Sequence, residues 1–343
     1  MKDRRASPRS SPRPAVGLAD LAQLVRAPAA LSVPGDVLAG AAAAGHPLSV
    51  RTFGVMGSSV CLYWAGMALN DYADATIDAV ERPERPVPSG RVPRRTALAV
   101  AGALTAGGLA LAAASGGRRS LLGALPLAGA VWAYDLMLKS TPAGPAAMAS
   151  ARALDVMAGA LAAGPGPDRT HGTGAALRRG AVPAALVGAH TYTLTALSRH
   201  EISGAPARLP ALTLAASTAT ALATALPAVR AAVAASGRLP ERAGTACAAR
   251  SGAAGGGARS TATRAAVVTA GALTYLGSYG TAQARAVREP SGENVRRAVG
   301  AGILGLMPLQ AALTARSGAT VAAAALGVVH PLARALARRI SPT

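Results

Sequence analysis

The chain has 343 residues, of which 51% are hydrophobic and 3% aromatic, and its formal net charge is +20. Together with a mean hydropathy of +0.33, this composition excludes an ordinary soluble domain and indicates a protein with several membrane-spanning segments. The basic residues are spread between apolar runs and few aromatic residues accompany them, so the composition also excludes a nucleic-acid-binding protein that stacks bases.

The N-terminal residues 1–17 are basic and rich in Ser and Pro, and we expect them to form a disordered cytoplasmic tail. Residues 18–340 are expected to form one membrane domain. The two cysteines, Cys61 in an apolar stretch and Cys247 in a polar one, provide neither a disulfide framework nor a metal-binding pair.

Ten apolar segments follow, each close to the roughly 20 residues that a helix needs to cross a bilayer. They lie near residues 21–44, 50–70, 95–115, 119–138, 142–164, 178–198, 208–233, 264–286, 294–314 and 318–336. The sequence therefore predicts an all-α fold, a polytopic membrane bundle of nine or ten transmembrane helices. The distribution of Lys and Arg predicts that the N-terminus and the loop 71–94 are cytoplasmic, in a multi-pass protein of the cell inner (plasma) membrane.

The end of the second segment concentrates the scarce acidic residues, because residues 71–84 contain three Asp and two Glu of the fifteen acids in the chain. Helical spacing puts Asp71, Asp74 and Asp78 on one face, with Asn70 beside them. Three carboxylates at the rim of a low-dielectric region require a cation. Oxygen ligands of this kind favour Mg²⁺, which usually binds through a few carboxylates together with substrate phosphates.

A basic turn, RPERPVPSGR, comes directly after these carboxylates. Arg82, Arg85 and Arg91 offer forked donors for phosphate oxygens, while the Pro and Gly residues keep the backbone out of a helix. The two features together predict a metal site next to an anion-binding site. The alternative is a solvated loop whose charges pair with one another.

Three later features carry open alternatives. Asp135 and Lys139 are four residues apart, so Lys139 either binds an anion or pairs with Asp135. Arg152 and Asp155 stand within an apolar segment, where ionisable residues either indicate a functional site or pair with each other. Residues 234–263, rich in Gly, Ala and Arg without periodicity, are expected to form a flexible loop.

The stretch from Asn70 to Gly90 resembles the first signature of the UbiA family of intramembrane prenyltransferases, N-D-x-x-D-x-x-x-D followed by R-P-x-P-S-G. The family's Tyr and Lys on its fourth helix are matched by Tyr134 and Lys139, and Arg26 matches an Arg of its first helix. The resemblance covers roughly residues 18–340. It implies a helical bundle around a central cavity, in which Mg²⁺ bridges the aspartates to a prenyl diphosphate. It also implies catalytic roles for the matched Tyr and Lys and a substrate-binding role for the matched Arg.

The family's second Asp-rich motif, at the end of its sixth helix, is altered in this chain. The region reads HTYTLTALSRHEISG, in which residues such as Ser198 and Arg199 replace the aspartates and Glu201 is the carboxylate that remains. Either Arg199 and His200 supply the charge of a missing metal ion, or Glu201 alone helps to hold a cation, or the chain no longer catalyses transfer. We expect Ser198, Arg199 and Glu201 to contact the substrate. The segments SRHEISG, ARALDVMAG and GLMPLQAAL resemble a divergent branch, the EboC proteins.

The resemblance implies an Mg²⁺-dependent transferase that moves a prenyl group from a prenyl diphosphate to a hydrophobic or aromatic acceptor within the lipid bilayer. The alternative is a catalytically silent UbiA-like protein that acts in lipid or metabolite binding, export or assembly. The intact first motif favours the enzyme, whereas the altered second motif favours the silent protein.

Overall fold

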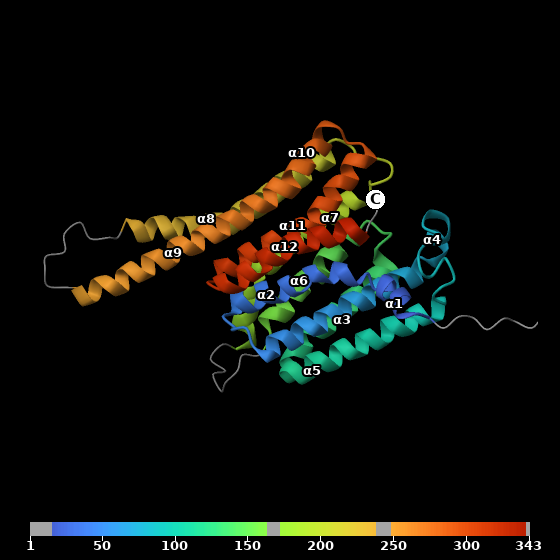
Figure 1. Cartoon of the computed structure of the whole chain (residues 1–343), viewed down its shortest axis with the longest axis horizontal. Coiled ribbons are helices and arrows are strands. Elements are labelled where there is room, and N and C mark those ends of the chain that lie inside the picture. Colours follow the sequence, from blue (N-terminus) through green and yellow to red (C-terminus); the bar gives the residue numbers. More distant parts are fainter. Residues whose placement is uncertain (1–15, 163–171, 238–247, 341–343) are drawn as a thin grey trace, which may run out of the picture.

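The computed structural model describes residues 16–162, 172–237 and 248–340, and every regular element in these ranges is a helix (Figure 1). The α-helices are α1 Leu18–Leu24, α2 Pro34–Ala44, α3 Val50–Ala73, α4 Ala75–Glu81, α5 Arg94–Ala133, α6 Gly144–Ala160, α7 Thr173–Ser198, α8 Arg208–Ser236, α9 Ala248–Tyr275, α10 Thr281–Arg288, α11 Gly292–Arg316 and α12 Thr320–Ile340. A 3-10 helix, η1, spans Ala27–Ser32, and π-helical turns span Tyr134–Leu138 (η2) and Leu276–Gly280 (η3). The expected all-α class is confirmed.

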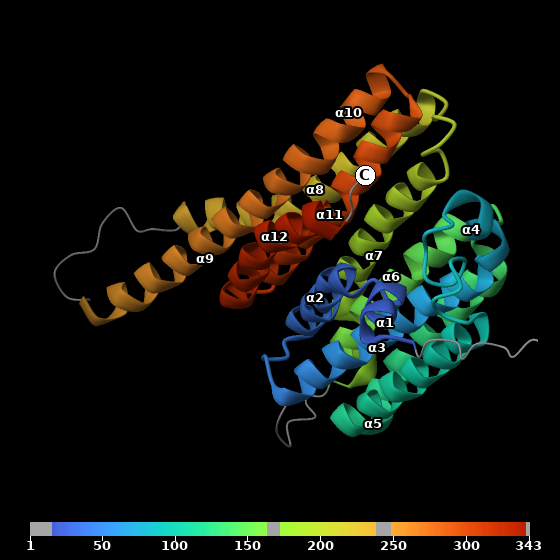
Figure 2. The same cartoon turned by 45° about the vertical axis from the view of Figure 1, so that its right-hand side comes forward.

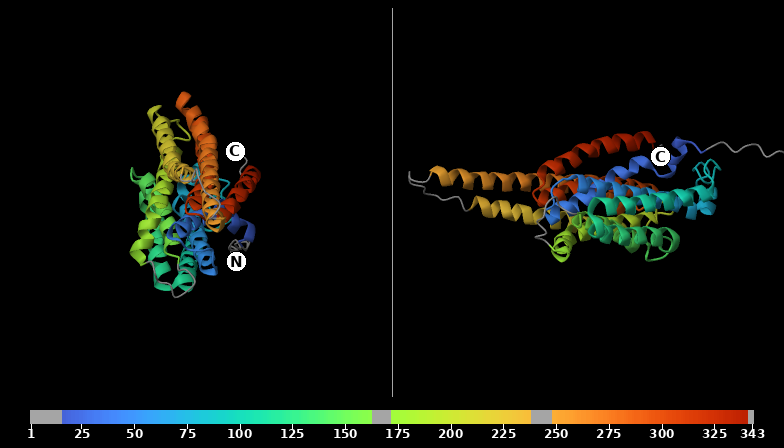
Figure 3. Two further views of the ribbon diagram at one scale, coloured as in Figure 1. Left: turned by 90° about the vertical axis from the view of Figure 1, so that its left-hand side faces the viewer. Right: turned by 90° about the horizontal axis from the view of Figure 1, so that it is seen from below.

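The helices form one bundle in which α7 has a central position. Figure 2 shows α3, α5 and α6 on one side of α7, and α8, α9 and α10 on the other. In agreement, α7 packs against α6 and α2 as well as against α8 and α11. The view from below in Figure 3 shows that α8 and α9 extend as a pair beyond the other helices at one end.

Helix α5 consists of two arms that meet at Gly116 and Gly117, where the backbone is not helical. Gly117 has a φ of +58°, which glycine adopts without the steric cost that other residues have. The second arm runs back along the first, and a hydrogen bond joins the two arms: Trp132 Nε1 donates to Thr105 Oγ1 over 3.0 Å. The two arms correspond to the expected segments 95–115 and 119–138.

Four helices in the described part of the chain are long and apolar enough to cross a membrane: α3, α5 together with η2, α8 and α11. Shorter apolar helices occupy Ala30–Ala44 and Thr320–Pro331. Each of the ten apolar segments overlaps a helix, which agrees with the helical assignments made from the sequence. The count of nine or ten crossings and the cytoplasmic orientation stay predictions.

Two segments differ from the expectation. The first apolar segment, 21–44, is not one helix, because Arg26 has a φ of +48° and Pro34 begins a new helix after η1. The expectation of a flexible loop over 234–263 is wrong for most of its length, since α8 continues to Ser236 and α9 begins at Ala248. Alanine has the highest helix propensity, and it outweighs the missing apolar periodicity there. Residues 238–247 of the expected loop and 1–15 of the expected tail lie outside the described residues.

Close packing between α2 and α6 depends on two glycines. A Cβ atom added to Gly40 would lie 1.8 Å from the backbone oxygen of Val156, and one added to Gly159 would lie 2.1 Å from that of Val37. Small residues permit this approach of two backbones in a membrane bundle. The contact brings the polar residues of α6 next to those of α2.

Candidate active site

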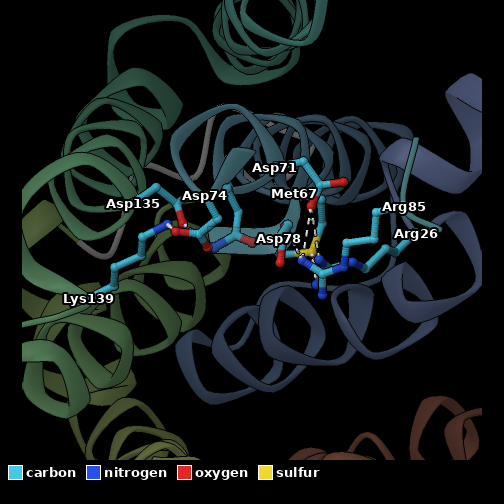
Figure 4. A network of polar contacts seen from close by, with 9 residues as sticks. Arg26, Met67, Asp71, Asp74, Asp78, Arg85, Asp135 and Lys139 are labelled. Atoms are coloured by element: carbon cyan, nitrogen blue, oxygen red, sulfur yellow. Dashed lines mark hydrogen bonds and ion pairs between the residues drawn. The ribbon is translucent and has the colours of Figure 1, made fainter. Parts of the chain in front are cut away.

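Helices α3 and α4 place the acidic residues at one end of the bundle. Asp74 stands between the two helices with a φ of −87° and a ψ of 5°, so the helix is interrupted there. Asp71 and Asp78 are seven residues apart and both are 2% exposed. In Figure 4, the carboxylates of Asp71 and Asp78 lie near Arg26 and Arg85, whereas the carboxylate of Asp74 lies next to Lys139. The expected single stripe of three carboxylates is therefore divided into two parts.

Two arginines neutralise the first part. Arg26 Nη2 donates to Asp71 Oδ1 over 3.0 Å, and Arg26 Nη1 contacts Met67 Sδ at 3.6 Å. Arg85 Nη1 lies 2.6 Å from Asp78 Oδ2 and 3.6 Å from Asp71 Oδ1. Arg26 and Arg85, which are far apart in the sequence, thus meet at the same pair of carboxylates.

The second part combines Asp74 with the π-helical turn η2. Lys139 Nζ lies 2.6 Å from Asp74 Oδ1, so Lys139 pairs with Asp74 rather than with Asp135 four residues earlier. Asn70 Nδ2 donates to Asp135 Oδ1 over 3.3 Å. The turn η2 also carries Tyr134, and π-helical turns inside α-helices occur frequently at functional sites.

The donor chemistry of this end of the bundle fits Mg²⁺. Within the described ranges, no three His, Cys, Asp or Glu side chains are grouped so that they could hold a metal ion among themselves. The carboxylates form two neighbouring pairs, Asp71 with Asp78 and Asp74 with Asp135. Because Mg²⁺ is usually bound through one or two carboxylates while waters and substrate phosphates complete its coordination, each pair provides suitable oxygen ligands. Magnesium itself stays a proposal.

The C-terminal end of α7 lies near the turn η2. Arg199 directly follows the last residue of α7, and its charge acts on the phenol of Tyr134. Ser198 Oγ donates to the backbone oxygen of Thr195 over 3.0 Å, so this hydroxyl bonds to its own helix. Contact of either residue with substrate stays a prediction.

Glu201 lies in the loop after α7 and faces the basic turn. Burial raises the pKa of Glu201, while the positive charges of Arg82 and Arg296 act in the opposite direction. Arg296 Nη2 also donates to the backbone oxygen of Glu201 over 3.3 Å. Arg82 and Glu201, both predicted from the sequence as substrate contacts, therefore interact electrostatically.

Arg91 is placed differently from the other predicted site residues. Its Nη1 lies 2.7 Å from Asp20 Oδ1 and 2.8 Å from Gln23 Oε1, and its Nη2 donates to the backbone oxygen of Glu84 over 2.8 Å. Arg91 therefore joins the basic turn to α1, and its ion pair is with Asp20 rather than with Asp71.

A cavity of about 230 Å³ leads from the acidic residues into the bundle. One face of α3 lines it at helical spacing, with Ser59, Leu62, Tyr63, Gly66, Met67 and Asn70. Eleven residues separate the first of these from the last, so the lining extends about 16 Å along the helix. Arg26, Tyr134 and Asp135 line the cavity at its outer end, next to the acidic residues.

The inner end of the cavity contains a second charged cluster. Arg152 Nη2 lies 2.8 Å from Asp36 Oδ2, so Arg152 pairs with α2 rather than with Asp155 on its own helix. Gln310 Nε2 of α11 donates to Asp36 Oδ1 over 2.6 Å, and Ser59 Oγ donates to Asp155 Oδ1. Asp36, Gln310 and Ser59 were missed by sequence reasoning. Polar side chains inside the first and ninth apolar segments are the signal that could have found the first two.

Comparison with known proteins assigns the family. The model of the UbiA prenyltransferase family matches residues 33–338. The chain belongs to the UbiA prenyltransferase family. A digeranylgeranylglyceryl phosphate synthase from Ignicoccus hospitalis is 40% identical over 116 residues, which cover 34% of this chain and 35% of the relative. The chain spans less than half the length of the curated relatives it matches. These relatives are named digeranylgeranylglyceryl phosphate synthase, so the EboC assignment stays a prediction.

Two solved structures share the UbiA fold. One, of digeranylgeranylglyceryl phosphate synthase in membranes, has a TM-score of 0.53 and 14% identity, and the match covers 88% of this chain and 98% of the other. The second, an apo structure of a UbiA homologue from Aeropyrum pernix K1, has a TM-score of 0.51 and 20% identity, with coverage of 80% and 94%. These similarities support the fold of a membrane bundle.

Most residues matched to the UbiA signatures meet in one region of the bundle. Ion pairs join Arg26, Asp71, Asp74, Asp78, Arg85 and Lys139 there, and Asn70 and Tyr134 line the adjoining cavity. Arg91, which directly follows the signature, instead contacts α1. The first UbiA motif therefore forms a compact polar site at the mouth of an apolar cavity.

Proposed function

We propose that this protein is a membrane-embedded transferase that moves a prenyl group from a prenyl diphosphate to a hydrophobic acceptor, an aromatic ring being one candidate, with Mg²⁺ as cofactor. One observation carries the proposal: a single cavity joins a charged end, formed by carboxylates and basic groups, to an apolar stretch lined by Leu62, Leu127 and Val131. A prenyl diphosphate needs both environments in one molecule. Prenyl transfer also agrees with the family and with the name of the matched relatives.

The basic residues at the outer end would bind the diphosphate. Arg26 and Arg85 each offer a forked set of donors that can hold two phosphate oxygens, and Lys139 offers a point charge opposite them. Mg²⁺ held by Asp71 with Asp78, or by Asp74 with Asp135, would neutralise the diphosphate charge and assist its departure. The present ion pairs between these acids and bases would then be replaced by contacts to phosphate.

The cavity wall would protect the reacting carbon. Departure of the diphosphate leaves a positive charge on the allylic group, and water would quench it. Leu62, Met67 and Val131 line the cavity and exclude water, while the ring of Tyr134 offers a negative face to the charge. A nucleophilic atom of the acceptor would then form the new bond to this carbon and release its proton.

Arg199 would compensate for the altered second motif. It lies at the end of α7, near Tyr134, where its charge can act on the departing diphosphate. A guanidinium keeps its charge and needs no metal to do so. Ser198 and Glu201 are near Arg199 in the sequence. We propose that the carboxylate of Glu201 orients the side chain of Arg82 in the basic turn.

A catalytically silent protein that binds a prenyl lipid is the second candidate, and the altered second motif favours it. Incubation of purified protein with radiolabelled geranylgeranyl diphosphate, with and without Mg²⁺, separates the two. An enzyme releases diphosphate in a Mg²⁺-dependent way, and Asp74→Asn abolishes this release. Glu293→Gln, a change of an exposed carboxylate that pairs with Arg297, serves as the matched control and leaves release unchanged. Tight binding without release in the parent protein would favour the silent candidate.

A further inference from the structure

The inner end of the cavity has the wrong charge for an anionic ligand. Asp36 and Asp155 are 0% and 4% exposed, and both lie close to the single guanidinium of Arg152. With Asp155 ionised, the two carboxylates and one guanidinium carry a net negative charge. A carboxylate or phosphate that entered this end would lose its water and meet a guanidinium whose charge Asp36 already balances, next to the like charge of Asp155.

One guanidinium nitrogen of Arg152 contacts protein groups. Its Nη2 pairs with Asp36 Oδ2 at 2.8 Å and also donates to the backbone oxygen of Ser32 over 3.4 Å. The other oxygen of Asp36 accepts from Gln310. Arg152 and Asp36 therefore tie α2, α6 and α11 together, and the charge of Asp36 balances that of the guanidinium.

Asp155 retains an acceptor for a ligand. Its Oδ1 accepts from Ser59, while its Oδ2 has no hydrogen-bond partner within the described part of the chain. The side chain lines the cavity although it is nearly completely buried. An oxygen at the cavity wall without a protein donor can accept from an N–H or O–H group of a ligand, whereas it would repel a second acceptor.

Tyr63 adds a second polar contact on the same wall. It is one helical turn after Ser59 on the cavity face of α3, and the charges of both Arg152 and Arg26 act on its phenol. Along the lining face of α3, Tyr63 lies between Ser59 at the inner end and Asn70 at the outer end. Among the described residues no hydrogen-bond partner of this hydroxyl is found, which leaves it available to a ligand.

We propose that the inner end of the cavity binds the head group of the acceptor and selects a hydrogen-bond donor, a hydroxyl or an amine, over a carboxylate or phosphate. Asp155 accepts the hydrogen bond and Tyr63 provides the second contact. The separation of about 16 Å along α3 lets the head group lie deep while the reacting atom lies toward the diphosphate. The proposal rests on the proposed prenyl transfer for the identity of the ligand as acceptor.

Charge-selective labelling of a cysteine in the cavity tests the proposal without any turnover. In a background with Cys61→Ser and Cys247→Ser, Met148→Cys places a thiol on the cavity wall one turn before Arg152. The detergent-solubilised full chain is treated with methanethiosulfonates that carry an ammonium, a hydroxyl or a sulfonate group. After correction for reaction with a free thiol, we expect the ammonium reagent to react about tenfold faster than the sulfonate reagent. Equal rates, or a faster sulfonate reagent, would overturn the proposal.

Asp155→Asn tests whether Asp155 causes the preference for the ammonium reagent. The substitution keeps the shape of the side chain and an oxygen that can accept from Ser59. We expect this variant to reduce the ammonium-to-sulfonate ratio about fivefold. Asp20→Asn, which removes a carboxylate on α1, is the matched control and leaves the ratio unchanged. If Asp155→Asn does not give monodisperse protein, Asp155→Glu is used, and it should keep the ratio of the parent. An unchanged ratio in folded Asp155→Asn contradicts the role of Asp155.

The head-group preference is read from protection of the same thiol. 4-Hydroxybenzyl alcohol and 4-hydroxybenzoate share a ring and differ in one group, and the uncharged hydroxyl reagent reports occupancy of the cavity. We expect the alcohol to slow labelling more than the acid does, and Asp155→Asn to remove this difference. Protection by the acid at least equal to that by the alcohol, or by neither compound, refutes the head-group assignment. Diphosphate release by the parent protein is measured separately. If the labelling shows the expected preference for ammonium but no diphosphate is released, prenyl transfer is refuted and the head-group site is not.

Discussion

Replacing Asp71 with Asn should change how diphosphate binding depends on Mg²⁺. Asp71 Oδ1 lies 3.0 Å from Arg26 Nη2 and 3.6 Å from Arg85 Nη1. Asparagine keeps the shape and one acceptor oxygen but removes a negative charge. Without Mg²⁺, the two arginines are then less neutralised, so the variant should bind geranylgeranyl diphosphate more tightly than the parent. With Mg²⁺, the variant lacks a metal ligand and should bind more weakly.

The size of the effect follows from the charges. Two unit charges about 4 Å apart interact by about 4 kcal/mol at an effective dielectric constant of about 20. Arg26 is 37% exposed, so solvent screening reduces this value, and we expect about 2–3 kcal/mol. The Kd measured without Mg²⁺ is divided by the Kd measured with Mg²⁺. This ratio should be about 10²-fold smaller in Asp71→Asn than in the parent.

The assay is a titration of geranylgeranyl diphosphate into purified protein, once with Mg²⁺ and once with a chelator. Glu293→Gln is again the control, because it removes an exposed carboxylate far along the sequence from the site. If Asp71→Asn keeps the Mg²⁺ dependence of the parent, Asp71 is no metal ligand and the reasoning fails.

Four further outcomes are expected. Arg199→Ala should lower the rate of diphosphate release about 10²-fold, and Arg199→Lys should restore part of that rate. An unchanged rate in Arg199→Ala would show that this charge serves only the orientation of the protein in the membrane. Arg91→Ala should leave diphosphate affinity unchanged and lower the free energy of unfolding by about 0.5–1 kcal/mol, since its ion pair is partly exposed; a loss of affinity would contradict the contact with α1. Gly159→Ala should destabilise the protein by about 1–3 kcal/mol in thermal unfolding because its Cβ would meet the α2 backbone at 2.1 Å, while Gly129→Ala, with open space around it, should not. A cysteine at Ser89 should react only with reagents that reach the cytoplasm, and labelling from the opposite side alone would reverse the predicted orientation.

Much of the fold could be read from the sequence because its determinants are local. The ten apolar segments overlap helices, and the break in α5 at Gly116 and Gly117 separates two of them as expected. Apolar length and glycine conformation are properties of a few adjacent residues. The expectation for 234–263 failed because the absence of periodicity was weighted above the helix propensity of alanine.

The first acidic motif was also readable, but its arrangement was not. Spacing alone put Asp71, Asp74 and Asp78 on one helical face, whereas the helix is interrupted at Asp74 and the carboxylates separate toward different bases. Which base each acid meets depends on where η1 and the turn η2 pack against α3. Arg91 had the same chemistry as Arg85 in the sequence and differs from it only through its contact with α1.

The sequence by itself determined that this is a basic, polytopic helical membrane protein of UbiA type with a carboxylate-rich helix end, because composition, segment length and motif spacing do not depend on packing. Only the tertiary structure decided that Arg152 pairs with Asp36, that Gln310 completes this pair, and that Asp155 lines the cavity with an unused oxygen. Asp36 and Gln310 are 274 residues apart in the chain. Contacts over such separations arise when helices pack to bury their polar groups together in a low-dielectric interior, and no local pattern of residues specifies which helices will meet.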